Sequence, residues 1–294
     1  MALPWRLTTV FIHVLWKGWA LNFAPVKIAQ ETALVGGHVG NPAVIIVPEL
    51  LRVTEQVKQH ASRIADEGQF RVLLLDLYKG RMGHKDIDPN ALAERISLEG
   101  AVNAISEAAE YLKSEKSAKV GLVGFCEGGA IPFAGLATAA DICCGVVFLS
   151  NGALFGVSPE TLDVKSLAAK PVQGHYGALD AAGNADGTTA YLLEKNLRSA
   201  GNADATMYVY ETVGQSFMND NPHPFDSFEK RQQELGYPPY DEEQASAAWE
   251  RLFAFLGWHL AGRLPPTEDG VQESLQMEGI AEADDSKPMR PDEL

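Results

Sequence analysis

The stretch Gly121-Leu122-Val123-Gly124-Phe125-Cys126-Glu127-Gly128-Gly129-Ala130 decides the fold. An apolar run enters a G-x-C-x-G-G turn and a second apolar run leaves it, which is typical of a strand that turns sharply into a helix. Small residues two positions before and after the cysteine let strand and helix approach closely, and Gly124 and Gly128 meet that need. The pattern therefore predicts a nucleophile elbow with Cys126 at its tip.

The same turn predicts how the cysteine would react. The N-terminus of a helix carries partial positive charge, which favours a thiolate over a thiol. The backbone amide of Glu127, directly after Cys126, would supply half of an oxyanion hole. In the alternative interpretation the turn persists because the fold needs it, and Cys126 is a small buried side chain.

Apolar runs and helical segments alternate along the middle of the chain. We expect buried strands at 43–47, 72–75, 119–123, 145–149, 172–176 and 207–210. We expect helices at 54–67, 93–113, 188–200 and 245–261. This alternation predicts an α/β protein with a doubly wound, mostly parallel sheet flanked by helices. In such a sheet the ligand site lies beyond the carboxyl ends of the strands.

The two ends of the chain differ from the middle. No acidic residue precedes Glu31, and the first thirty residues are basic and aromatic, a composition typical of an organelle transit peptide. Their apolar run at 7–16 is shorter than the about 20 residues of a membrane span, so an interfacial or partner-docking segment is favoured. The segment 264–294 holds nine acidic and two basic residues. We expect one domain at 41–263, between an N-terminal extension at 1–40 and an acidic tail.

Composition excludes several classes of function. The chain has 24 Lys and Arg against 39 Asp and Glu, a net charge of -15 that argues against binding of nucleic acid. Its three cysteines, Cys126, Cys143 and Cys144, give neither a disulfide framework nor the spacing of a zinc site. Neither G-x-G-x-x-G after a strand nor a P-loop occurs, so we expect no cofactor and no metal.

Several blocks, in order, resemble the dienelactone hydrolase family of α/β-hydrolases, whose members are also called carboxymethylenebutenolidases. The blocks are Val47-Pro48-Glu49, Asp76-Leu77-Tyr78 with Arg81, the elbow, His175-Tyr176-Gly177-Ala178-Leu179-Asp180, Ser216-Phe217-Met218-Asn219-Asp220 and Trp249-Glu250-Arg251. The resemblance covers roughly residues 41–262.

The resemblance implies a role for each matching position. Cys126 would be the nucleophile, Asp180 the orienting acid, and Glu49 the carboxylate that manages the thiol in the resting state. The amides of Leu50 and Glu127 would form the oxyanion hole. Arg81 would hold an anionic group of the substrate.

One position departs from the family in a way that affects catalysis. The family has Gly-His-x-Phe at the general base, and this chain has Gly214-Gln215-Ser216-Phe217. A glutamine cannot take a proton from a thiol near pH 7, and a positioned base contributes about 10²–10⁴ in rate. The anion-binding Arg that follows the family's histidine also has no counterpart here. Direct deprotonation of Cys126 by Glu49, or substitution by His223 on the same loop, stay open, whereas His175 is interpreted as a structural histidine and His60 is placed outside the site.

These departures favour a catalytically impaired dienelactone-hydrolase-like protein, a pseudoenzyme that serves as an accessory or structural subunit of a larger assembly. Protein partners would bind the N-terminal extension and the acidic tail. The acid-free N-terminus favours a mitochondrial location over a cytoplasmic one, and contact of this segment with a membrane stays open. The alternative is an active hydrolase of a small ester, thioester or lactone that uses Cys126 with a non-standard base. A third interpretation is a non-catalytic ligand sensor that uses the pocket in which the family binds its substrate.

Overall fold

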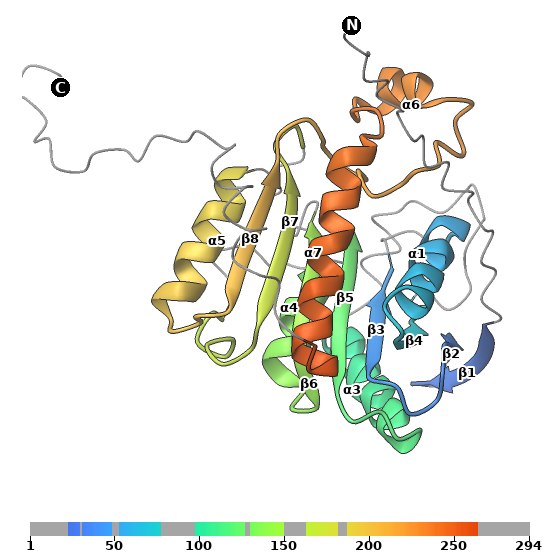
Figure 1. Cartoon of the computed structure of the whole chain (residues 1–294), viewed down its shortest axis with the longest axis vertical. Coiled ribbons are helices and arrows are strands. Elements are labelled where there is room, and N and C mark those ends of the chain that lie inside the picture. Colours follow the sequence, from blue (N-terminus) through green and yellow to red (C-terminus); the bar gives the residue numbers. More distant parts are fainter. Residues whose placement is uncertain are drawn as a thin grey trace, which may run out of the picture.

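The computed structural model describes residues 23–29, 31–48, 53–77, 98–126, 130–149, 163–181 and 187–263 of the 294-residue chain. Within these ranges one eight-stranded sheet has the order β1-β2-β4-β3-β5-β6-β7-β8 (Figure 1). The strands are β1 Ala24–Ile28, β2 Glu31–Gly36, β3 Ala43–Val47, β4 Arg71–Leu74, β5 Val120–Cys126, β6 Ile142–Leu149, β7 Val172–Gly177 and β8 Ala205–Tyr210. Strands β3 to β8 are parallel, whereas β1 and β2 pair antiparallel and β2 joins β4 antiparallel.

Helices cover both faces of the sheet (Figure 1). Helices α1 Glu55–Asp66 and α7 Glu242–Ala261 pack on one face, and α3 Leu98–Ser114, α4 Ala130–Thr138 and α5 Gly187–Ser199 pack on the other. The short helix α6 Phe228–Leu235 lies in the connection from β8 to α7, beyond the carboxyl ends of the strands. No helix in the described ranges is long and apolar enough to cross a bilayer.

Strand β3 shows why the sheet needs both layers. Its sequence is Ala-Val-Ile-Ile-Val and all five side chains are fully buried. Alternate side chains enter opposite cores, so Ile45 packs with α3 whereas Val44 and Ile46 pack with α1 and α7. A strand that is apolar on both faces is stable only when helices cover both of them.

Local signals fix the helix ends that bear on the site. Helix α1 begins after Thr54, whose hydroxyl accepts a hydrogen bond from the Val57 amide. Helix α7 begins after Asp241, whose carboxylate accepts from the amides of Glu243 and Gln244. It ends at Gly262, which adopts the left-handed conformation that favours glycine.

The expectation of a mostly parallel sheet flanked by helices is confirmed, and the helix predicted at 54–67 spans Glu55–Asp66. Two features differ from the expectation. Residues 24–28 and 31–36, assigned to the N-terminal extension, form the antiparallel strands β1 and β2, and the pairing of β2 with β4 depends on a contact between distant segments. Helix α6 was not predicted because it is short and polar, with Arg231 as its buried residue. The expected helical residues 93–97 lie outside the described ranges.

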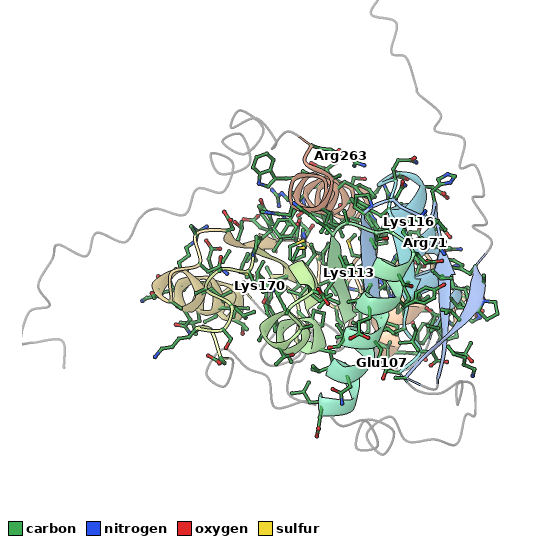
Figure 2. All side chains as sticks on the ribbon, turned by 90° about the horizontal axis from the view of Figure 1, so that it is seen from below. Arg71, Glu107, Lys113, Lys116, Lys170 and Arg263 are labelled. Carbon is green, nitrogen blue, oxygen red and sulfur yellow. The ribbon has the colours of Figure 1, made fainter. Side chains whose placement is uncertain are left out.

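The amino edge of the sheet, where helices end and strands begin, gathers basic side chains. Figure 2, viewed from below, shows Arg71, Lys113, Lys116, Lys170 and Arg263 across this edge. Lys170 Nζ donates to the Ile142 carbonyl at 2.5 Å, and Arg263 donates to the Gly68 carbonyl at 2.7 Å. Cations placed at helix C-termini and exposed carbonyls are stabilising.

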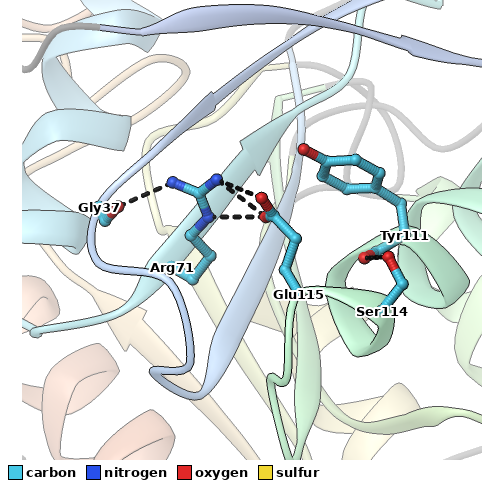
Figure 3. Close-up of polar contacts among 5 residues, drawn as sticks. All are labelled: Gly37, Arg71, Tyr111, Ser114 and Glu115. Atoms are coloured by element: carbon cyan, nitrogen blue, oxygen red, sulfur yellow. Dashed lines mark hydrogen bonds and ion pairs between the residues drawn. The ribbon is translucent and has the colours of Figure 1, made fainter.

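Arg71 makes the most complete contact at this edge (Figure 3). Its Nε and Nη2 each lie 2.9 Å from a carboxylate oxygen of Glu115, and its Nη1 donates to the Gly37 carbonyl at 2.7 Å. The pair joins β4 to the end of α3, and Gly37 adds the connection from β2 to β3. A forked pair of this kind satisfies a buried guanidinium in one geometry.

Candidate functional site

The carboxyl ends of the parallel strands bring three expected site segments to one edge. In the sheet register Cys126 pairs with Leu149, Phe148 with His175, and Gly177 with Tyr210. The end of β5, the loop after β7 and the loop after β8 therefore lie at the same edge. These segments carry Cys126, Asp180 and Gln215 in turn. The side chain of Cys126 lies outside the described part of the chain.

The loops that carry Asp180 and Gln215 are joined through their backbones. The Ala178 amide donates to the Tyr210 carbonyl at 2.8 Å, and the Leu179 amide donates to the Val213 carbonyl at 2.9 Å. A Cβ at Gly177 would lie 2.5 Å from the Val213 carbonyl oxygen, so only glycine permits this approach. The tertiary structure thus places the proposed orienting acid and the residue at the base position on adjacent segments.

The backbone beside Gln215 is held in an uncommon conformation. Ser216 has a φ of 61°, in the left-handed region that non-glycine residues rarely adopt. The turn closes with a hydrogen bond of 3.0 Å from the Asn219 amide to the Ser216 carbonyl. Such conformations persist only where the surrounding structure over-determines them, and they are frequent at functional sites.

A row of aromatic rings crosses the sheet directly beneath this edge. Ring centroids are 5.0 Å apart between Phe125 and Phe148, 4.4 Å between Phe148 and His175, and 5.8 Å between His175 and Tyr210. The row is extended by Phe217, whose ring lies 5.2 Å from that of Tyr210. Phe125, the residue before Cys126, and Phe217 of the Gln215 loop therefore belong to one row of ring contacts, which stabilises their relative placement.

His175 is part of that row and has hydrogen bonds on both ring nitrogens. Its Nε2 lies 3.0 Å from the side-chain carbonyl of Gln173, and its Nδ1 lies 2.8 Å from the Tyr210 hydroxyl. A carbonyl oxygen only accepts, so Nε2 carries the proton and Nδ1 accepts from Tyr210. Burial, and then the nearby Arg251, lower the pKa of His175 well below its usual value. The interpretation of His175 as a structural histidine is confirmed.

His60 is the residue that sequence reasoning missed. It lies on α1, yet its Nε2 is 3.1 Å from the carbonyl of Met218, in the Gln215 loop. Burial lowers the pKa of His60 to about 4, so the ring is neutral near pH 7. Its place could not be read from the chain because the two residues are 158 positions apart.

The remaining expected residues have different outcomes. His223 is exposed, and its amide donates to Asn221 Oδ1 at 2.9 Å within its own loop. Glu49, Leu50, Arg81 and Glu127 lie outside the described residues, so the oxyanion hole and the anion contact stay predictions. Among the residues that the structure describes, no group of three or more His, Cys, Asp or Glu is placed to hold a metal ion.

Comparisons with known proteins identify the family of this chain. The sequence model described as the dienelactone hydrolase family matches residues 32–260. A Yersinia pestis protein provisionally named carboxymethylenebutenolidase is 25% identical over 257 residues, which are 83% of this chain and 87% of that protein. A protein of the same provisional name from Saccharolobus solfataricus is 25% identical over 73% of this chain and 88% of its own length.

Solved structures share the fold at lower sequence identity. A provisionally named dienelactone hydrolase from Klebsiella pneumoniae superposes with a TM-score of 0.62 at 23% identity, over 81% of this chain and 99% of that one. A dienelactone hydrolase-like promiscuous phosphotriesterase from metagenomic libraries gives a TM-score of 0.63 at 18% identity, over 82% and 99%.

Proposed function

The chain belongs to the dienelactone hydrolase family, and we propose that it is a catalytically impaired member whose site lacks the general base. The observation that carries this proposal is Gln215, which lies on the loop joined to that of Asp180. A carboxamide hydrogen-bonds to a thiol but cannot remove its proton near pH 7. Loss of a positioned base removes about 10²–10⁴ in rate, or roughly 3–5 kcal/mol of transition-state stabilisation.

The described histidines near this edge do not offer an obvious substitute for the missing base. Both ring nitrogens of His175 are engaged, one of them by the accept-only oxygen of Gln173. His60 is buried, its lowered pKa makes it a weak base, and its Nε2 proton is directed at a backbone carbonyl. His223 is exposed on the loop beyond Asn221. A general base needs its partner proton within hydrogen-bond reach.

The experiment is hydrolysis of a small activated ester and of a lactone by purified protein. We expect no Cys126-dependent rate in the wild type and a gain of about 10²-fold or more in Gln215→His. Gln215→Asn, which keeps the carboxamide, is the matched control and should stay inactive. The combination of Gln215→His with Cys126→Ala should lose the new rate, which assigns the turnover to the thiol.

We propose further that the protein serves as an accessory or structural subunit of a larger assembly, with a mitochondrial location. The support is in the sequence: an acid-free, aromatic segment before Glu31 and an acidic segment at 264–294, which offer partner surfaces of different character. The native mass of the protein extracted from its source tests this part. A free monomer of 31.8 kDa would contradict it.

An active hydrolase is the second candidate, and the placement of Cys126 favours it. This residue ends β5 at the same edge as the Asp180 and Gln215 loops, as a working nucleophile requires. Glu49 would then deprotonate the thiol directly, and the substrate would be a small ester, thioester or lactone. The metagenomic relative, named a promiscuous phosphotriesterase, adds phosphotriesters to the substrates worth assaying. A wild-type rate that disappears when Cys126 is alkylated would establish this function and overturn the first one.

A further inference from the structure

Helix α1 meets the Gln215 loop through two polar side chains one helical turn apart, Gln56 and His60. Gln56 Nε2 donates to Asp220 Oδ1 at 2.9 Å, and His60 Nε2 faces the Met218 carbonyl at 3.1 Å. His60 is only 4% exposed, with its ring centroid 4.8 Å from that of Phe125. The contacts bridge 164 and 158 positions of the chain, so they attach the loop to a different layer of the fold.

The proton positions in this cluster follow from its acceptors. The Met218 carbonyl only accepts, so neutral His60 must carry its proton on Nε2. Asp220 Oδ1 also accepts, which fixes the Gln56 carboxamide with its nitrogen toward the aspartate. Gln56 Nε2 then lies 3.1 Å from His60 Nε2, and two donors face each other. When Met218 and Asp220 both receive their hydrogen bonds, the two nitrogens therefore form no hydrogen bond with each other.

Two more buried atoms of the cluster lack partners. His60 Nδ1 and Gln56 Oε1 have no hydrogen-bond partner among the residues that the structure describes. Buried polar atoms without partners destabilise a fold, and an apolar side chain at position 60 would avoid that cost. Packing therefore does not explain the histidine, whereas its hydrogen bond to the Gln215 loop does.

We propose that His60, assisted by Gln56, is a positioning residue that fixes the direction of the side chain at position 215. The loop has two anchors. On one side the Leu179 amide binds the Val213 carbonyl, and on the other His60 binds the Met218 carbonyl. Between them stands Ser216 with its φ of 61°, a conformation that must be held from both sides. The inference rests on the proposed function in one respect, the placement of residue 215 at the base position.

The test compares variants of position 60 in the Gln215→His background. His60→Leu removes the donor at similar volume, and His60→Gln keeps a donor for the Met218 carbonyl. Ile64→Val, an apolar change at a fully buried position one turn further along the same helix, is the control for stability. For each variant we would measure kcat and KM on the activated ester, and the midpoint of urea unfolding.

We expect His60→Leu to lower kcat about tenfold or more, with KM changed by less than about twofold, because a misdirected base affects the chemical step. His60→Gln should restore most of kcat. Ile64→Val should leave kcat unchanged even if it lowers the unfolding midpoint equally. The proposal is overturned if His60→Leu leaves kcat unchanged, or if Ile64→Val lowers it as much.

A second measurement separates this proposal from the proposed function. If Gln215→His has no activity, the assignment of position 215 as the base position fails, but the anchoring role of His60 is still testable in the wild type. Hydrogen exchange of the Asn219 amide, which donates to the Ser216 carbonyl, reports on the loop directly. His60→Leu should speed this exchange about tenfold or more, and His60→Gln should not. Equal exchange in wild type and His60→Leu would overturn the anchoring role.

Discussion

Two buried polar clusters at opposite edges of the sheet differ in how completely their atoms are paired. At the amino edge, Arg71 directs three nitrogens at Glu115 and Gly37, all within 2.9 Å. At the carboxyl edge, His60 and Gln56 each retain a buried atom without a partner in the described part of the chain. The satisfied cluster is accounted for by stability alone, whereas the unsatisfied one is accounted for by what it holds in place. Fold rules are commonly violated where a site must be built.

The largest expected effect is the loss of stability in acid, which should come from the buried histidines near the carboxyl edge. Unfolded histidines have a pKa near 6.5, and folding lowers the pKa of His60 to about 4 and that of His175 as well. Below pH 6.5 the unfolded state therefore binds more protons than the folded state. The free energy of unfolding decreases as the pH is lowered. His60 alone should account for about 3 kcal/mol between pH 6.5 and 4. No such change is expected above pH 6.5.

Urea unfolding of the wild type and of His60→Gln from pH 7.5 to 4.5 measures this response. The variant should be destabilised less by acid, because it lacks one of the two buried imidazoles. Parallel curves for both proteins would show that His60 does not titrate as its burial implies, and the contrast between the edges would weaken.

A change at the amino edge should lower the free energy of unfolding without changing turnover at the candidate site. Glu115→Ala would strip Arg71 of its carboxylate and should lower the free energy of unfolding by about 3 kcal/mol. Glu115→Gln retains one acceptor and should cost less. In the Gln215→His background both changes should leave kcat within about twofold of the parent, because the pair lies at the opposite edge. A large loss of kcat in either Glu115 variant would show that the amino edge also affects the candidate site, contrary to this comparison.

Alanine substitutions at one glycine of each edge should have effects of intermediate size. Gly37 has a φ of 79° and faces the Phe70 carbonyl, and Gly177 faces the Val213 carbonyl. Alanine at either position should destabilise the fold by about 1–3 kcal/mol through crowding. Only Gly177→Ala should also reduce the turnover of Gln215→His, because it separates the Asp180 and Gln215 loops. Equal effects on turnover from Gly37→Ala would contradict that assignment.

The smallest expected effect concerns the aromatic row under the site. The guanidinium of Arg251 lies 4.1 Å from the Tyr208 ring centroid and 5.3 Å from that of Tyr210. Arg251→Met keeps the aliphatic contact and removes the charge, so it should cost about 0.5–1 kcal/mol in the free energy of unfolding. The free energy of unfolding of Arg251→Lys should lie between those of the wild type and Arg251→Met. A loss well above this range would mean that Arg251 has a further partner in this layer.

Much of the fold was predictable because its signals are local in the chain. Strand β3 was predicted with the bounds that the structure gives it, since five consecutive apolar residues can only be buried on both faces. The helix expected at 54–67 is present as α1, within one residue at each end. The hairpin β1–β2 was missed because exposed and buried residues are mixed along both strands and its pairing with β4 has no local signal.

The candidate site divides in the same way. The elbow pattern around Cys126 and the glutamine at position 215 are readable because each belongs to a short block of residues. The strand and helix that flank the elbow are present as β5 and α4. The role of His60 was not readable, because nothing in the residues around it indicates a carbonyl 158 positions away.

The sequence by itself determined the parallel α/β architecture, the cysteine at the strand end and the glutamine at position 215. These depend on hydrophobic period, turn chemistry and residue type, which are properties of neighbouring residues. Only the tertiary structure decided that the Gly177 and Val213 backbones touch, and that α1 holds the Gln215 loop through His60. Those contacts join segments that are distant in the chain, and they exist only once the two helical layers have closed on the sheet.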